Sequence, residues 1–137
     1  TGHMVFSTLH TNSAVQTINR IVDVFPPHQH DQVRAQISFV LEGIISQQLI
    51  PRRNAPGRVL AYELLIPNQA IRNLIREDKL HQVYSIMQIS QKQGIRTLNQ
   101  SLALLTVAGH ISLDEAVARS TDYDELISLL QKSGMKL

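Results

Sequence analysis

Residues 3–11 run His3-Met4-Val5-Phe6-Ser7-Thr8-Leu9-His10-Thr11, a short apolar stretch followed at once by polar side chains. Consecutive apolar residues cannot place alternate side chains in water, so the stretch predicts a strand near residues 3–8 that is covered on both faces, as in a parallel sheet. The polar residues then fall where this strand gives way to a loop. Because ligands of open α/β sheets bind outside the carboxyl ends of the strands, we expect the functional site at this loop.

A second buried strand is predicted at residues 58–66. The segment is apolar on both faces apart from Glu63, it is closed by Pro67, and the turn-forming residues 54–57 precede it. A carboxylate inside such a strand is costly unless it is paired. We therefore expect Glu63 to have a cationic or an N–H partner.

The rest of the chain has helical patterns. Asn12 or Ser13 can cap a helix that Pro26-Pro27 ends, and apolar residues then recur at helical spacing over a second helix from about residue 28 to residue 49. Asn68 can cap a third helix whose core is residues 70–79. Three further helices are predicted by capping boxes, which pair Thr97 with Gln100, Ser112 with Glu115 and Asp122 with Glu125.

Composition narrows the function classes. The chain has no cysteine, which excludes a disulfide framework, a cysteine-based zinc site and a thiol nucleophile, and makes the cytoplasm the default compartment. Its net charge is only +2 without a basic block, and aromatic residues are 4%, so nucleic acid is not an expected partner. No metal site is predicted either, because His28 and His30 do not share a helix face.

Residues 1–14 resemble, almost letter for letter, the histidine box of the type IV pilus and secretion ATPases, whose core is a RecA-like P-loop NTPase domain. The resemblance continues through residues 20–26 and the strand that carries Glu63. In that family the Thr-Leu-His-Thr loop faces the terminal phosphate of the nucleotide. The roles that the resemblance implies are phosphate sensing for His10, support of the box for His3, and nucleotide binding for Thr8 and Thr11.

The predicted helix at residues 70–79 carries a second resemblance. Taken alone, it is an amphipathic surface helix with polar rows at i, i+4 spacing. Its sequence Ala70-Ile71-Arg72-Asn73-Leu74-Ile75-Arg76-Glu77 is similar to the signature of the pilus retraction ATPases, the PilT family. In the family this helix is needed for retraction rather than for hydrolysis. The resemblance therefore implies a role in motor coupling for Arg72, Asn73, Arg76 and Glu77.

The chain lacks the P-loop pattern Gly-x-x-x-x-Gly-Lys-Ser/Thr, since none of its six glycines precedes a lysine in that frame. In the family the P-loop lies upstream of the histidine box. The resemblance thus implies an α/β fold: the C-terminal part of a RecA-like P-loop NTPase domain in residues 1–67, and a C-terminal helical subdomain in residues 68–137. Such a fragment would not hydrolyse ATP alone.

The resemblance also implies what the complete protein does. It would be a hexameric motor that holds ATP and Mg²⁺ mainly through residues absent from this chain and powers pilus retraction in twitching motility. It would be cytoplasmic and peripheral at the inner membrane, bound to the platform protein of the pilus.

Two alternatives stay open from the sequence. A pilus assembly or type II secretion ATPase would share the box, but the retraction signature and the lack of cysteine argue against it. A non-catalytic helical interaction domain is supported only by the missing P-loop.

Overall fold

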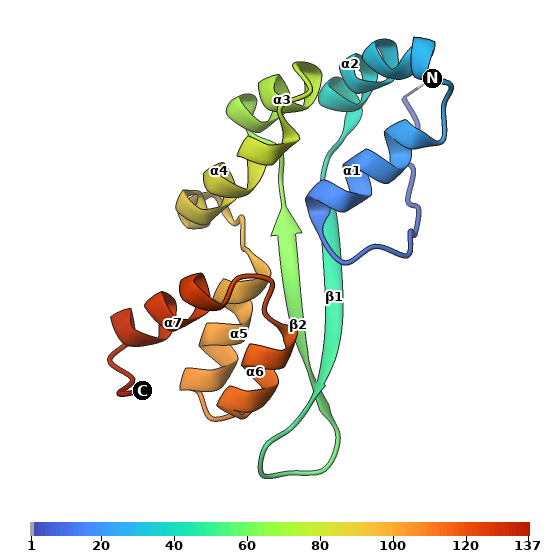
Figure 1. Ribbon diagram of the computed structural model, residues 1–137. Helices are drawn as coiled ribbons and strands as arrows, with labels where there is room; N and C mark the ends of the chain where they lie inside the picture. Colours follow the sequence, from blue (N-terminus) through green and yellow to red (C-terminus); the bar gives the residue numbers. More distant parts are fainter. Residues whose placement is uncertain (1) are drawn as a thin grey trace.

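The computed structural model describes residues 2–137, and its central element is a long hairpin of two antiparallel strands (Figure 1). Strand β1 (Ile44–Pro51) pairs with β2 (Arg58–Leu65) along its whole length. The tip of the hairpin extends beyond the helices. The α-helices, in chain order, are α1 (Ala14–Asp23), α2 (His30–Val40), α3 (Gln69–Arg76), α4 (Val83–Ile89), α5 (Leu98–Val107), α6 (Leu113–Arg119) and α7 (Tyr123–Lys132). Single 3-10 turns lie at Pro27–Gln29, Leu80–Gln82 and Gln91–Gln93.

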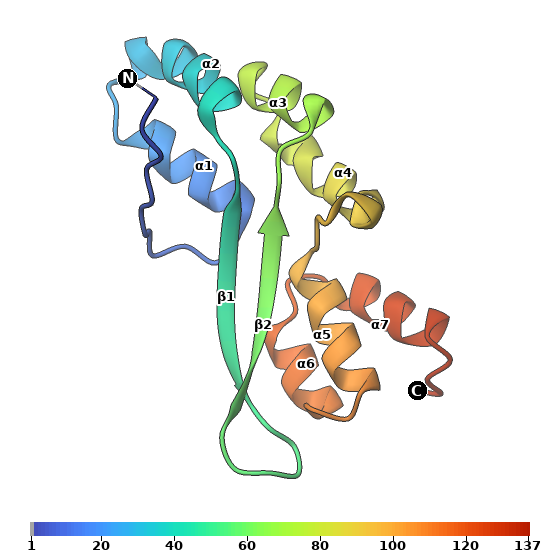
Figure 2. The same ribbon diagram turned by 180° about the vertical axis from the view of Figure 1, so that it is seen from behind.

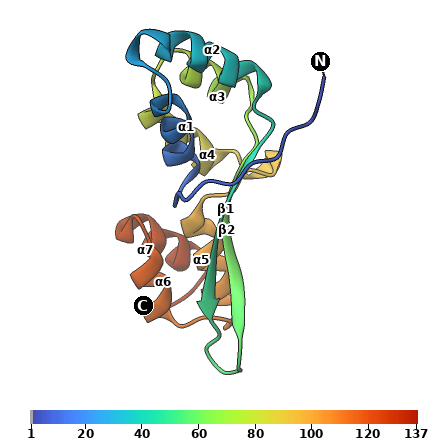
Figure 3. The same ribbon diagram turned by 90° about the vertical axis from the view of Figure 1, so that its right-hand side faces the viewer.

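The hairpin is buried on one face only. Ile44, Ser46 and Ile50 of β1 point to the same side as their neighbours on β2, and this side carries the buried positions. On the opposite side, Ile45 and Leu49 are exposed. Figure 3, which views the hairpin from its edge, shows α5, α6 and α7 together on one side of it.

Two hydrophobic clusters occupy the two ends of the buried face. The first surrounds Ile44 and Leu65 and contains α1, α2, α3 and α4, while the second surrounds Ile50 and Ala61 and contains α5, α6 and α7. Ser46 and its cross-strand neighbour Glu63 lie between them along the hairpin. The expected division of the chain into residues 1–67 and 68–137 stays a prediction.

The predicted helix starts are confirmed. Ser13 caps α1 by accepting a hydrogen bond from the Gln16 N–H, and Asn68 caps α3 in the same way. Thr97 and Gln100 form a complete capping box at the start of α5. Ser112 and Asp122 accept from the third residue of α6 and of α7, which is one half of a capping box in each case.

The strand predicted near residues 3–8 is wrong. The structure assigns no strand there, and Met4, Val5 and Phe6 are 68%, 79% and 91% exposed. A strand needs a neighbour for its backbone N–H and C=O groups, and no other segment within residues 2–137 pairs with this one. The parallel, doubly covered sheet is therefore absent from the described part of the chain, and the two strands that form are antiparallel.

The helix predicted from about residue 28 to residue 49 is confirmed over residues 30–40, but its extension to residue 49 is wrong. Helix α2 ends at Val40, Leu41 has an extended backbone, and β1 follows. The apolar spacing of residues 44–50 suits a helix, but it also suits a strand with alternate residues buried. The second strand, confirmed at Arg58–Leu65, supplies a complete ladder of partners, and this tertiary pairing overrides the local pattern.

None of the helices within residues 2–137 is both long enough and apolar enough to cross a lipid bilayer.

Replacing Phe6 and Ile18 separately by alanine tests whether residues 3–8 are unpacked, as the structure has them. Ile18 is 0% exposed in the first cluster, so Ile18→Ala should lower the free energy of unfolding by about 2–5 kcal/mol. Phe6 is 91% exposed, so Phe6→Ala should change it by less than about 0.5 kcal/mol. Urea denaturation of the 137-residue chain measures both values. A loss at Phe6 equal to that at Ile18 would show that the segment is packed in solution.

Candidate functional site

The segment that contains the predicted box lies beside α1 and the start of β1 (Figure 2). Together these elements line a cavity of about 490 Å³ that is open to solvent. Its polar lining comes from Ser7, Thr8, Thr11, Thr17, Ser46 and Gln47, and its apolar lining from Val5, Leu9, Ile21, Leu41, Ile44 and Ile45. Two of the residues assigned to the site from the sequence, Thr8 and Thr11, thus border a cavity.

The hydroxyl of Thr11 is held by α1. Its oxygen lies 2.6 Å from the Thr17 hydroxyl, which itself donates to the carbonyl oxygen of Ser13 at 2.8 Å. Because Thr17 has a single hydroxyl proton, Thr11 must be the donor in the first bond. The proton of Thr11 is therefore committed to α1, whereas Thr8 makes no hydrogen bond within the described chain.

His3 and His10 are both exposed. Neither ring forms a hydrogen bond to another residue between 2 and 137, and neither is among the residues that line the cavity. The structure therefore does not bring these histidines together with Thr8 and Thr11 in one pocket, and their predicted roles stay predictions.

Glu63 joins the end of the box to the helices that follow the hairpin. Its side chain is buried, with 3% exposed, and Oε1 accepts from the backbone N–H of Ala14 at 2.8 Å. Its other oxygen, Oε2, accepts from the N–H of Leu98 at 3.3 Å. These are the first residues of α1 and α5, whose N–H groups have no partner within the helix. The expected N–H partner of Glu63 is confirmed, and there are two.

The burial of Glu63 dominates its protonation equilibrium. Loss of solvent raises the pKa of its carboxyl above the ordinary value of 4.5, with a smaller contribution in the same direction from the charge of Glu125. The hydrogen bonds from Ala14 and Leu98 act in the opposite direction, since they stabilise the charged form. Two helix starts thus stabilise the charged form of the carboxyl, whereas its burial in the core disfavours that form.

Helix α3 is attached to α2 by the first of the residues assigned to coupling. Arg72 Nη1 donates to the carbonyl oxygens of Ser38 at 2.8 Å and Phe39 at 3.3 Å. Both carbonyls belong to the last turn of α2, where helical partners are missing. Arg72 therefore acts here as a cap for α2.

The other three residues assigned to coupling bond only within their own segment. Asn73 Oδ1 accepts from Arg76 Nη2 at 2.7 Å, and Glu77 pairs with Lys79 at 2.9 Å. Arg76 and Glu77 are exposed. Their side chains are therefore available to a surface that approaches α3.

A second contact between α2 and α3 was not predicted from the sequence. Asp78 follows α3 with φ of 57°, the left-handed conformation that closes a helix end, and its carboxylate lies 3.1 Å from Arg34 Nε of α2. The Lys79 N–H donates to the carbonyl oxygen of Leu74 at this same end. The pattern of a polar residue just after a helix can indicate such an end, but the partner on α2 cannot be found from local sequence.

A network of polar side chains between α4, α5 and α7 was also missed. Glu125 Oε2 accepts from the Tyr84 hydroxyl and from Asn99 Nδ2, both at 2.7 Å. Burial, together with this carboxylate, raises the pKa of Tyr84 well above its ordinary range. Asn99 also accepts from Ser120. No local pattern links residues so far apart, and their bonds fix the helices of the second cluster to α4.

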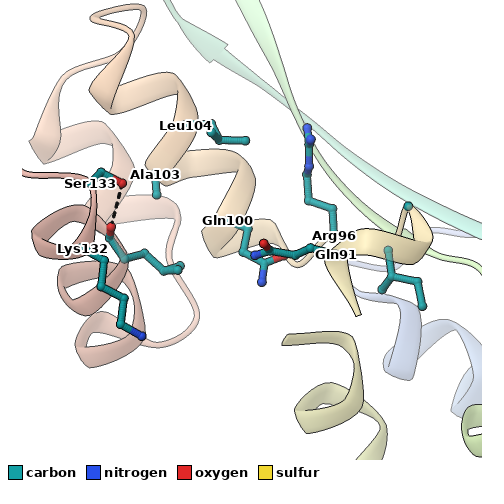
Figure 4. A pocket seen from close by; sticks show the side chains of 10 residues that line it. Gln91, Arg96, Gln100, Ala103, Leu104, Lys132 and Ser133 are labelled. Carbon is teal, nitrogen blue, oxygen red and sulfur yellow. Dashed lines mark hydrogen bonds between the residues drawn. The ribbon is translucent and has the colours of Figure 1, made fainter. Parts of the chain in front are cut away.

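A smaller cavity of about 300 Å³ lies between the segment before α5, α5 itself and α7 (Figure 4). Gln100 faces it, but its amide oxygen accepts from Thr97 and its amide nitrogen donates to Gln88. Arg96 donates to the Tyr62 hydroxyl at 2.7 Å and stacks over the Tyr62 ring. The polar groups of Gln100 and Arg96 therefore have partners already, and none of the residues assigned to the site from the sequence lines this cavity.

Comparison with known proteins places these features in a family. Residues 1–55 match the family model described as Type II/IV secretion system protein. The chain is 49% identical over 116 residues to the type IV pilus retractation ATPase PilT of Pseudomonas aeruginosa, a match that covers 85% of this chain and 33% of that protein. It is 44% identical over 126 residues to a twitching motility protein of Neisseria gonorrhoeae, covering 92% of this chain and 34% of that protein.

A solved structure is similar in fold as well as in sequence. The crystal structure of the pilus retraction motor PilT with bound ADP matches 93% of this chain and 35% of that chain, with a TM-score of 0.83 and 58% identity. This similarity confirms the predicted fold class, part of a RecA-like P-loop ATPase domain with the helices that follow it. The chain spans about a third of the length of the curated relatives it matches.

Glu63→Gln should change the pH dependence of stability. With its pKa raised in the folded chain, Glu63 binds a proton more tightly when folded, so its contribution to stability falls as the pH rises above 4.5. The wild-type chain should therefore lose stability relative to Glu63→Gln as the pH rises above 4.5. Glu77→Gln is the control of opposite sign, because Lys79 lowers the pKa of Glu77, so that the wild-type chain should lose stability relative to this variant as the pH falls below 4.5. Denaturation curves at several pH values measure both differences, and equal signs would contradict the assignment.

Arg72→Ala and Arg76→Ala should differ in stability although both residues lie on α3. Arg72→Ala leaves two carbonyls of α2 without their charged donor and should cost about 1.5–3 kcal/mol. Arg76→Ala removes an exposed bond to Asn73 and should cost less than about 0.5 kcal/mol. Urea denaturation gives both numbers. Equal losses would rule out a specific capping role for Arg72.

Proposed function

Since the chain belongs to the PilT family of pilus retraction ATPases, we propose that it is part of an ATP-driven motor. This motor would power type IV pilus retraction and twitching motility. The observation that carries this proposal is the identity of 44–58% to retraction and twitching-motility proteins over most of this chain. The general family model ends at residue 55, whereas the similarity to the retraction motors continues through the hairpin and the helices. Retraction is favoured over assembly or secretion because this second part includes the signature in α3.

The box fits a contact with phosphate but not a complete nucleotide site. Residues 1–78 contain no lysine, so the lysine that a P-loop aims at the β- and γ-phosphates does not come from the surroundings of the box. The box does supply a free hydroxyl on Thr8 and an exposed imidazole on His10. In the complete protein, ATP and Mg²⁺ would be held mainly by residues outside this chain, and hydrolysis of the γ-phosphate would supply the energy.

Within that site we assign different tasks to the box residues. An N–H of the His10 ring would donate to an oxygen of the γ-phosphate and so distinguish ATP from ADP. Thr8 is the better placed of the two threonines to donate a hydrogen bond to phosphate, because the Thr11 proton is already used within the chain. Thr11 would fix the loop to α1, and His3 would support the box from its other end.

The assembly and its partners follow from the same proposal. Ring-shaped motors convert nucleotide state into rigid-body shifts between neighbouring subunits, and we propose a hexamer of this type. Arg76 and Glu77 are exposed and would meet a neighbouring subunit or the pilus platform protein, with Asn73 bonded to the Arg76 side chain, while Arg72 attaches α3 to α2. The motor would work at the cytoplasmic side of the inner membrane. The division of the chain into an ATPase part, residues 1–67, and a helical part, residues 68–137, belongs to this proposal.

His10→Ala in the complete motor subunit tests the role of the box. Loss of one hydrogen bond to a phosphate that changes charge during the reaction should lower ATP turnover by about 10²-fold, with circular dichroism and melting temperature unchanged. His28→Ala is the control, because His28 is exposed and lies outside the box. Turnover measured by phosphate release should stay at the wild-type level in the control. Wild-type turnover in His10→Ala would remove the sensing role.

A further inference from the structure

Glu63 accepts two hydrogen bonds, one on each carboxylate oxygen, and the proposed function gives them no role. It joins Ala14, 49 residues earlier in the chain, to Leu98, 35 residues later. On the hairpin, Glu63 lies between the two hydrophobic clusters, and its partners begin helices of different clusters. No other described side chain accepts hydrogen bonds from the starts of two helices.

A carboxylate is the side chain that this position requires. The two N–H groups both donate, so the bridge needs two acceptors, and the partial positive charges of two helix starts favour a negative group between them. Glutamine has almost the same shape but offers one acceptor and one donor. In a Glu63→Gln chain, one of the two N–H groups would face an amide NH₂ and lose its partner.

One end of the bridge is firmly fixed. The first residues of α5 are buried, and the Ser101 hydroxyl accepts from the backbone N–H of Tyr62 on β2 at 3.1 Å. The other end, Ala14, is completely buried and is the last residue of the box. The box itself contributes little to its own position, because residues 2–10 form no backbone hydrogen bond within the described chain. The point at which the box meets the rest of the molecule is therefore held by the Glu63 bond to Ala14, together with the Thr11–Thr17 bond and the Ser13 cap of α1.

We propose that Glu63 is a positioning residue for the histidine box, and that its carboxylate makes the start of α1 and the start of α5 move as one body. This inference rests on the proposed function, since it gives the box a nucleotide to face. Through the bridge, a shift of the box when ATP is hydrolysed would be passed to α5 and thus to the second cluster. Glu63 does not touch the nucleotide in this account, and it acts only through the backbone of Ala14 and Leu98.

The bridge itself can be tested in the 137-residue chain without any nucleotide. In wild type, the Ala14 and Leu98 amides should be protected from hydrogen exchange, although first residues of helices are normally open. In Glu63→Gln, one of the two should exchange about tenfold faster or more, measured by NMR. Unchanged exchange at both amides would overturn the proposal.

The consequence for the motor is tested in the complete subunit with a double-mutant cycle. Glu63→Gln should lower kcat for ATP several-fold with little change in KM, because the residues that bind most of the nucleotide are untouched. If Glu63 acts through the box, Glu63→Gln should have no further effect on kcat in a His10→Ala background. A loss of the same factor in both backgrounds would overturn the positioning role.

Tyr84→Phe is the matched control. It removes one hydrogen bond to another carboxylate, Glu125, and leaves α1 untouched. It should change neither the exchange rates of the Ala14 and Leu98 amides nor kcat. A loss of kcat equal to that of Glu63→Gln would show that both variants act by general destabilisation. The two proposals fail separately: normal turnover in His10→Ala removes the sensor while Glu63 is intact, whereas normal turnover in Glu63→Gln with an opened Ala14 amide removes only the positioning role.

Discussion

The carboxylate of Glu63 accepts one hydrogen bond from the start of α1 and another from the start of α5, and the architecture is arranged around this contact. The hairpin is buried on one face, and its two ends are covered by separate hydrophobic clusters. Each cluster has its own helices, and the two clusters are also joined by the hydrogen bonds that Glu125 accepts from Tyr84 and Asn99. At this junction the core tolerates a buried carboxyl, whose raised pKa reflects the loss of solvent, because two helix starts supply its donors.

A loop without internal hydrogen bonds depends for its position on the elements at its end. The box is anchored through Ser13, which caps α1, and through Thr11, whose hydroxyl bonds to Thr17. On the other side of the first cluster, Arg72 and Asp78 attach α3 to α2. The end of the box at Ala14 and the apolar residues Ile71 and Ile75 of the retraction signature therefore belong to one hydrophobic cluster. This gives a direct physical connection between the part proposed to detect phosphate and the part proposed to transmit motion.

The sequence predicted features that depend on neighbouring residues and missed those that depend on distant ones. Helix starts at Ser13 and Asn68 follow from local side chain to backbone bonds, and the second strand follows from its apolar run and its turn. The run at residues 3–8 has a strand pattern, but the structure gives it no partner, and the pattern of residues 44–50 fits two periods. Glu63 was expected to need a donor. That Ala14 and Leu98 are the donors could not be predicted, because nothing local connects them.

The backbone of residues 2–10 forms no hydrogen bond within the described chain, and this has a thermodynamic consequence. A chain segment without internal hydrogen bonds keeps its conformational entropy until something orders it, at a cost of about 1–2 kcal/mol for each residue that becomes fixed. Any surface that immobilises these residues must supply that free energy, and the segment regains its conformational entropy on release. This cost weakens binding at the segment and favours release, and so favours a contact that can be made and broken in every cycle over a permanent one.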